Sequence, residues 1–433
     1  MPFQTKSVIT TQKTQLFQYI CGAYFRQQRI TQNISLTDAA KSLKINKGFL
    51  SDLERGNRPF PNGIIEQFNE FYLTNFYFDD SAYNEALNLL EDIYVAYAQT
   101  NQDLIIQKFK IVLSNKEKVD TYAFFIYQLL YFFYYIEIEE NHEKADDIKN
   151  ILLNNIATFT DEQISILYSL CGVLCLKKDN INEAENFFLI SNEYCSKSSI
   201  MYALNMFYLI TIYSKMNKCA YSLLFLNQTK LILSTTLCYS RIVYTDLCEA
   251  YNLIQLGLYR ESNNLLLRIL DSGIAQIQDI SSYIYQLLAI VSLHISEFEG
   301  SINYFKKITD TNIKNKYIWI PSIAYYSLNN IKDLNLEIKN ISKDSKNKTI
   351  DFLYAIEDRV ENDYESFLRH ILVFYSFILE NHFYDMFSIV LHYILDFSKE
   401  KNDSKTTILA LNDLDFYHEN KLSITSSNLL KKK

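Results

Sequence analysis

The sequence predicts an all-α protein: an N-terminal helix-turn-helix domain followed by a right-handed tetratricopeptide-like α-solenoid. The first observation behind this prediction is that only 8 Gly and 4 Pro serve 433 residues, fewer than sheets with many turns would need. A second is a pair of helix-start signals in one short segment. The third is a sequence phrase that recurs about every 40 residues beyond residue 75, a period typical of paired-helix repeats.

The segment from Ser35 to Gly56 predicts two short helices joined by a tight turn. Ser35 with Asp38 three residues later is a capping-box start. Asn46 is a second N-cap residue, and Gly56 supplies a left-handed helix end.

The apolar residues of this segment fall at helical spacing on two faces that can pack together. They are Ala39, Ala40 and Leu43 in the first helix and Phe49, Leu50 and Leu53 in the second. The second helix therefore presents Lys47, Gly48, Ser51 and Asp52 outward.

The charge of the chain is unevenly distributed. Residues 1–72 hold 9 Lys and Arg against 5 Asp and Glu, a net charge of +4, whereas residues 73–433 hold 33 against 45, a net charge of −12. A basic head on an acidic body is expected when only the head meets phosphates.

Beyond residue 75 the recurring phrase runs from an apolar residue through a polar turn to a small residue. Its instances end at Ala86, Ala145, Ala184, Ser262 and Ser301, with a looser one at Ala220. The spacings from Ala145 onward are 39, 36, 42 and 39, which indicates stacked helical hairpins.

One repeat matches the tetratricopeptide pattern position by position. Its residues are Tyr168, Cys171, Gly172 and Cys175 on the first helix and Ala184, Phe188 and Ser191 on the second. Residues Thr311–Asp351 predict a distorted repeat or insertion, followed by helices over Asp363–Glu380 and Phe383–Lys399. The predicted domains are residues 1–72, the head, residues 73–420, the repeats, and residues 421–433, a polar basic tail.

Several classes of protein find no support in the sequence. The seven scattered cysteines form no CxxC pair, and the six histidines show no metal-ligand spacing. No nucleotide-binding or metalloprotease motif occurs, and the longest uncharged runs, of 17 residues, are too short for a membrane span. We expect a cytoplasmic protein that is not an enzyme and needs no cofactor or metal.

From Phe25 to about Tyr72 the sequence resembles the Xre-type DNA-binding domain of repressors. The matching residues include Arg26, the Ala39-Ala40 pair, Ile45 and the run from Leu50 to Arg58. Leu36 stands where many members carry a phosphate-clamping Gln, and Gly48 provides no side chain where relatives often read a base.

Together, the head and the repeats resemble the Rgg/PlcR-like (RRNPP) peptide-responsive regulators of Gram-positive bacteria. The resemblance implies a cytosolic homodimer whose heads bind an inverted-repeat operator in double-stranded DNA. It also implies that the repeat domain captures a short signalling peptide, and that this binding alters the heads. Whether the peptide activates or represses, and which peptide and operator are involved, is left open.

The outward face of the second short helix and the basic residues around it are the DNA-binding candidates. Asn46, Lys47, Ser51 and Asp52 are predicted to meet base edges, with Asp52 able alternatively to orient Arg55. Arg26, Thr37, Arg55 and Arg58 are predicted to meet phosphates.

A concave groove lined with aromatic and amide side chains suits an extended peptide. With the other repeats placed in the register of Gly172, the predicted peptide-binding residues are Tyr202, Asn205, Tyr213, Tyr244, Tyr251, Gln255, Tyr283, Gln286 and His294. Among these, Asn205 and Gln286 are the preferred amide candidates.

Two alternatives remain open from the sequence. In the first, the repeats form a protein-binding adaptor that sequesters a partner regulator, and the head is vestigial. In the second, the protein is a plain DNA-binding repressor whose repeats only dimerise.

Overall fold

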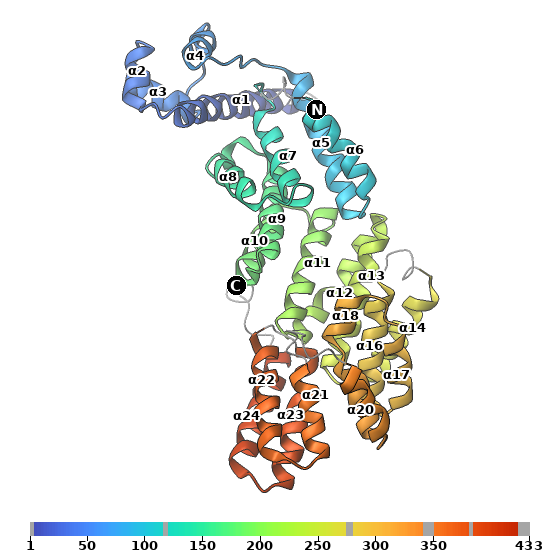
Figure 1. Ribbon diagram of the computed structural model, residues 1–433. Helices are drawn as coiled ribbons and strands as arrows, with labels where there is room; N and C mark the ends of the chain where they lie inside the picture. Colours follow the sequence, from blue (N-terminus) through green and yellow to red (C-terminus); the bar gives the residue numbers. More distant parts are fainter. Residues whose placement is uncertain (1–3, 116–119, 274–279, 341–349, 381–383, 423–433) are drawn as a thin grey trace. The chain divides into compact units, whose positions relative to one another are not determined.

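The structure, a computed structural model, describes residues 4–115, 120–273, 280–340, 350–380 and 384–422 (Figure 1). Within these ranges the chain is helical apart from turns and one isolated bridge between Tyr77 and Thr121, which confirms the predicted all-α class. The chain forms two compact units. One comprises Met1–Met206 with Thr236–Cys238, and the other comprises Phe207–Thr235 with Tyr239–Lys433.

The first unit begins with four helices that make up the head. They are α1 (Gln4–Thr31), α2 (Leu36–Ser42), α3 (Lys47–Glu54) and α4 (Ile64–Tyr72). The predicted caps are confirmed: the Ser35 side chain accepts a hydrogen bond from the Asp38 N–H, and that of Asn46 accepts one from the Gly48 N–H. Gly56 has the predicted left-handed conformation, with φ of 69°.

Helix α1 is the support on which the head packs. It contacts both α3 and α4. Its aromatic residues Tyr24 and Phe25 are fully buried, and Phe25 lies edge-on to Phe68 of α4 at 5.0 Å between ring centroids. In the same unit, the Tyr24 hydroxyl donates to the Asp120 carboxylate at 3.0 Å. The head is thereby joined to the repeats of the first unit by side chains as well as by the chain itself.

The rest of the described chain forms nine helical hairpins, in each of which two consecutive helices are joined by a short turn. Four begin in the first unit: α5 (Asp80–Ala98) with α6 (Gln102–Ser114), α7 (Phe124–Glu137) with α8 (His142–Leu153), α9 (Asp161–Lys177) with α10 (Ile181–Glu193), and α11 (Ile200–Lys215) with α12 (Cys219–Thr235). The boundary between the units falls within α11.

The other five hairpins belong to the second unit. They are α13 (Tyr239–Gln255) with α14 (Tyr259–Asp271), α16 (Ser281–His294) with α17 (Phe298–Lys306), α19 (Trp319–Ser327) with α20 (Ile331–Asn340), α21 (Ile350–Val360) with α22 (Tyr364–Glu380), and α23 (Tyr384–Glu400) with α24 (Ser404–Leu422). The short helices η2 (Ile156–Thr158) and α18 (Thr311–Lys316) lie between hairpins. Residues 423–433, most of the predicted tail, lie outside the described residues.

All nine hairpins use the same turn, in which the residue before the second helix's cap has positive φ. These residues are Thr100, Glu140, Asp179, Asn217, Gly257, Ser296, Asn329, Asn362 and Asn402, with φ between 51° and 80°. Asn is the residue other than Gly that tolerates this conformation best, and it occupies four of the nine positions. This choice explains how so many turns form in a chain with so few glycines.

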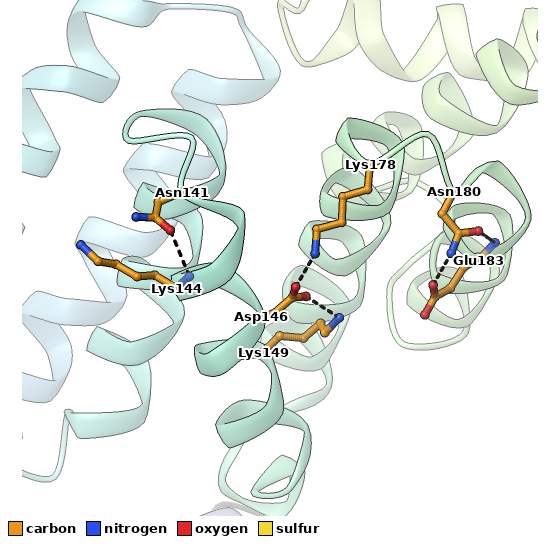
Figure 2. Close-up of polar contacts among 7 residues, drawn as sticks. All are labelled: Asn141, Lys144, Asp146, Lys149, Lys178, Asn180 and Glu183. Atoms are coloured by element: carbon orange, nitrogen blue, oxygen red, sulfur yellow. Dashed lines mark hydrogen bonds and ion pairs between the residues drawn. The ribbon is translucent and has the colours of Figure 1, made fainter. Parts of the chain in front are cut away.

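A hydrogen-bonding pattern accompanies the turn. In eight hairpins the N–H following the positive-φ residue donates to a carbonyl five residues earlier, as Asn180 does to Cys175 at 2.9 Å. Figure 2 shows two of the nine turns, in which Asn141 and Asn180 cap the second helices by accepting from the N–H groups of Lys144 and Glu183. Between these two hairpins, Asp146 of α8 pairs with Lys149 of α8 and with Lys178 at the end of α9.

In the five hairpins from α7–α8 to α16–α17, the two helices approach closely where a small residue lies four positions after the cap. Ser222, Ser262 and Ser301 are each fully buried, and each donates to a carbonyl twelve residues earlier, those of Ile210, Ala250 and Ala289. In the tetratricopeptide-matching repeat the equivalent pair is Ala184 and Gly172, and a Cβ on Gly172 would meet the Phe188 ring at 2.8 Å. That part of the sequence prediction is confirmed.

Two of the predicted repeat positions are corrected. Ala86 lies within α5, the first helix of its hairpin. The residue of this hairpin that is equivalent to Ala145 and Ala184 is therefore Ile105 of α6. In the fourth hairpin the small position is Ser222 and not Ala220, since Ser222 is the residue that contacts the preceding helix. With Ser222 in place, the spacings from Ala145 to Ser301 become 39, 38, 40 and 39.

The predicted distorted repeat over Thr311–Asp351 contains α18, the short hairpin of α19 and α20, and the beginning of α21. The two helices predicted after it correspond to α22 and α23. In the second unit the last hairpin returns to earlier repeats, since α24 contacts α12 and α23 contacts α13.

Candidate functional site

The exposed face of α3 is built by the cap at Asn46 and the burial of Leu50 and Leu53 against the head's interior. Lys47 at its first turn is exposed, and Ser51 one turn later is half-buried. The Oδ1 of Asn46 is occupied by the Gly48 N–H at 2.7 Å, so only its amide nitrogen faces outward for recognition.

The residues predicted to bind phosphate fall into two groups. Thr37, Arg55 and Arg58 are exposed, and Arg58 donates to the Asp52 carboxylate at 3.0 Å. Asp52 thus orients Arg58, and not Arg55 as the sequence suggested.

Arg26 is placed differently. Its guanidinium donates to the Asn154 carbonyl at 3.1 Å and to the Asn155 side chain at 2.5 Å, at the end of α8. These partners are 128 and 129 residues away in sequence. Through them Arg26 links the head to the repeats of the first unit. We therefore withdraw Arg26 from the DNA-binding candidates.

A buried ion pair holds α3 to α1. Arg29 donates to Glu54 from Nε at 2.7 Å and from Nη2 at 2.9 Å, and a third bond reaches the Ile34 carbonyl. The Glu54 hydrogen bond raises the pKa of Arg29, against the opposing effect of burial. Sequence reasoning missed this pair, although an Arg and a Glu on adjacent helices were a visible signal.

The predicted peptide-binding residues divide between the two units. In the first unit, Tyr202 is half-buried, and Asn205 is fully buried with its amide donating to Ser191 Oγ at 2.7 Å and to Asn192 Oδ1 at 3.0 Å. Among the described residues, Asn205 Oδ1 is a buried atom without a hydrogen-bond partner.

In the second unit, Tyr244, Tyr251, Tyr283 and His294 are half-buried, and the His294 ring stacks on Tyr259 at 4.3 Å between centroids. Tyr213, Gln255 and Gln286 are buried. Tyr213 packs against Tyr221, and Gln255 accepts a hydrogen bond from the Tyr417 hydroxyl of α24.

Of the nine predicted peptide-binding residues, Asn205, Tyr213, Gln255 and Gln286 are buried, so their side chains are not exposed to a ligand in this structure. The Gln286 amide is exceptional, since both its nitrogen and its oxygen are buried without a partner among the described residues. Such a group destabilises the fold by about 1–3 kcal/mol unless it finds a partner.

No helix among the described residues is long and apolar enough to cross a membrane. Within the same residues, no group of three or more His, Cys, Asp or Glu side chains has the arrangement of a metal site.

The hairpins, their shared turn and their small-residue contacts define a helical-repeat protein of the tetratricopeptide-like class. No family model matches the sequence, and no curated protein matches it either. Solved structures do match the fold, at low sequence identity.

One is a Rap protein complexed with competence and sporulation factor, with a TM-score of 0.57 and 14% identity over 79% of this chain and 99% of that one. Another is the apo form of the quorum sensor NprR from B. thuringiensis, with a TM-score of 0.59 and 10% identity over 77% and 99%. NprR in complex with its peptide NprX matches with a TM-score of 0.54 and 10% identity over 78% and 100%. The repeats thus have the same fold as the Rap protein and NprR, which agrees with the tetratricopeptide-like solenoid that the sequence predicted.

Proposed function

We propose that this protein is a DNA-binding transcription regulator whose repeat domain binds a short signalling peptide and mediates dimerisation. The observation that carries the proposal is the combination of two features in one chain. An exposed, capped helix lies on a basic head, and the repeats have the fold of structures that bind signalling peptides, competence and sporulation factor and NprX.

The head supports DNA binding through its exposed polar and basic side chains. Lys47 lies at the N-terminal end of α3, where recognition helices place base-reading residues. Thr37, Arg55 and Arg58 are exposed on the same domain and suit phosphates. The net charge of −12 on residues 73–433 would repel DNA from the remainder of the chain.

For the peptide, the half-buried residues of the second unit are the best candidates: Tyr244, Tyr251, Tyr283 and His294. Tyr417 of α24 holds the side chain of Gln255, so a peptide that used this amide would have to displace α24. Tyr417→Phe should then raise the affinity for the peptide, because one competing hydrogen bond is removed.

A gel shift with DNA from upstream of the gene, with and without short synthetic peptides encoded nearby, tests the proposal. Binding that changes with one peptide supports it. Absence of DNA binding would favour the adaptor with a vestigial head, and binding indifferent to every peptide would favour a plain repressor.

The recognition helix is tested by Lys47→Ala. The variant should lose affinity for the operator by about 1–3 kcal/mol for each base contact removed, and it should tolerate a changed base at that position. Lys110→Ala, an exposed lysine on α6, is the matched control and should bind as the unmodified protein does. Unchanged binding by Lys47→Ala would remove α3 from the proposal.

A further inference from the structure

The first unit contains a pocket of about 400 Å³ that belongs neither to the exposed face of α3 nor to the proposed peptide-binding residues. It is formed by Leu16 of α1, by residues of α5 and α9, and by Tyr122, which lies just before α7. Its volume is in the range of small-ligand sites in proteins. Leu16 places the pocket against the helix on which the head packs.

The floor of this pocket is apolar and well buried. Tyr83, Leu90, Tyr122 and Ile166 are each less than 10% exposed. The rings of Tyr83 and Tyr122 lie 4.6 Å apart, and Phe78 lies 5.2 Å from Tyr122. A ligand with an apolar or aromatic body would therefore find a preformed surface of aromatic rings.

The rim is acidic. Asp80, Glu91 and Glu162 line the pocket and are exposed, and none of its thirteen lining residues is Lys, Arg or His. The amides of Asn84 and Gln163 also line the pocket. Gln163 is fixed by its hydrogen bond from the Thr160 N–H at 3.0 Å, so it is held in place before any ligand enters.

The phenols of the floor remain neutral under ordinary conditions. Burial raises the pKa of Tyr122, and the charges of Tyr83 and Asp80 raise it further. Burial likewise raises the pKa of Tyr83. The negative potential of the pocket therefore comes from its three carboxylates, to which the electron-rich faces of the rings add attraction for a cation.

We propose that this pocket binds a small organic cation, with its apolar or aromatic body on the Tyr83–Tyr122 floor and a single ammonium group at the rim formed by Asp80, Glu91 and Glu162. The positive charge of such a ligand complements the three carboxylates, whereas an anion of the same shape would be repelled. Because the site lies wholly in the first unit, it stands independently of the proposed peptide response.

Titration calorimetry of the full-length protein with three ligands of one shape tests the proposal: 4-phenylbutylamine, 4-phenylbutanol and 4-phenylbutyrate. The amine should bind at least about tenfold more tightly than the alcohol, which corresponds to about 1.4 kcal/mol, and the carboxylate should bind most weakly. Added salt should weaken the binding of the amine more than that of the alcohol, because it screens the attraction between charges. Equal affinity for amine and carboxylate would overturn the proposal.

Variants separate the charge of the rim from the shape of the floor. The double variant Glu91→Gln/Glu162→Gln should reduce the preference for the amine over the alcohol, while Glu143→Gln, an exposed control on α8, should not. Leu87→Trp should fill the pocket and abolish binding of all three ligands, with circular dichroism confirming the fold. A preference for the amine that survives the double variant, or amine binding that survives Leu87→Trp in a folded protein, would place the ligand elsewhere.

Discussion

Gly22 of α1 lies directly against the backbone of Leu53 in α3: a Cβ on Gly22 would be 2.2 Å from the Leu53 carbonyl oxygen. No side chain can occupy that position unless the two helices move apart. This contact therefore sets how closely α3, which carries the proposed recognition face, packs against α1.

Gly22→Ala should therefore destabilise the protein by about 1–3 kcal/mol, since the backbone of α3 must shift. Gly300→Ala is the matched control, because the nearest atoms to a Cβ there are 3.7 Å away. That variant should be neutral or more stable by up to about 1 kcal/mol, as expected for Ala in place of Gly in a helix. Urea unfolding of both variants measures the difference, and equal stabilities would contradict the close contact.

The Arg29–Glu54 ion pair yields a second prediction. Glu54 is 4% exposed, so Arg29→Met leaves a buried carboxylate without its partner and should cost about 3–5 kcal/mol. Arg29→Met/Glu54→Leu should recover most of the loss, because the uncompensated charge is also gone. Arg58→Ala, which breaks the exposed pair with Asp52, should change the free energy of unfolding by less than about 1 kcal/mol.

The repeated serine contact is tested at Ser262. Ser262→Ala removes its hydrogen bond to the Ala250 carbonyl and should cost about 0.5–1.5 kcal/mol. Ser262→Leu should cost more, since Ser262 is fully buried where two helices approach closely. Ser327→Ala, at an exposed serine of the same unit, should stay within about 0.5 kcal/mol of the unmodified protein. A Leu variant as stable as the Ala variant would refute the close approach.

The head could be predicted from sequence because its signals are local. Ser35 and Asn46 cap backbone groups two or three residues away, and Gly56 ends a helix through its own conformation. Residues whose partners are distant could not be assigned this way. Arg26 binds residues 128 and 129 positions later, and Gln255 is covered by Tyr417, 162 positions later.

The positions of the repeats were harder to predict from the sequence than the head. Small residues were taken as the repeat signal, but the feature that all nine hairpins share is the positive-φ turn, which six different residue types occupy. Ala86 and Ala220 matched the small-residue pattern, although neither lies four positions after the cap of a second helix. Because several residue types can adopt this backbone conformation, a single sequence carries only a weak signal for it.

The thiols are expected to be unreactive in the folded protein. Burial raises the pKa of Cys175 and of Cys248 to about 11, and it also raises the pKa of Cys21, Cys171 and Cys195. Since the thiolate is the reactive form, an aromatic disulfide reagent at pH 7.5 should modify these thiols slowly. In guanidinium chloride all seven cysteines should react at once. Rapid modification of several thiols in the native protein would contradict this burial.

A pH dependence follows from Asp146. Burial alone would raise the pKa of its carboxyl, but hydrogen bonds from Lys178 and Lys149 hold that pKa below its usual range. A lowered folded-state pKa stabilises the protein above the unfolded-state value, about 4, and this contribution is lost as the pH falls through the folded-state value. Asp146→Asn should thus be less stable than the unmodified protein at pH 7, and the two should converge below about pH 4. Urea unfolding between pH 3 and 7 measures this, and a constant difference would exclude the charge as its cause.

The nine shared turns also bear on how the chain acquires its structure. Every hairpin closes through bonds between residues only a few positions apart, so each can form as soon as it has left the ribosome, before later repeats exist. The last hairpin closes in the same way, but its helices α23 and α24 also contact α13 and α12, which are far away in sequence. The surface of α12 and α13 that these helices cover therefore stays exposed on the nascent chain until the α23–α24 hairpin has been synthesised.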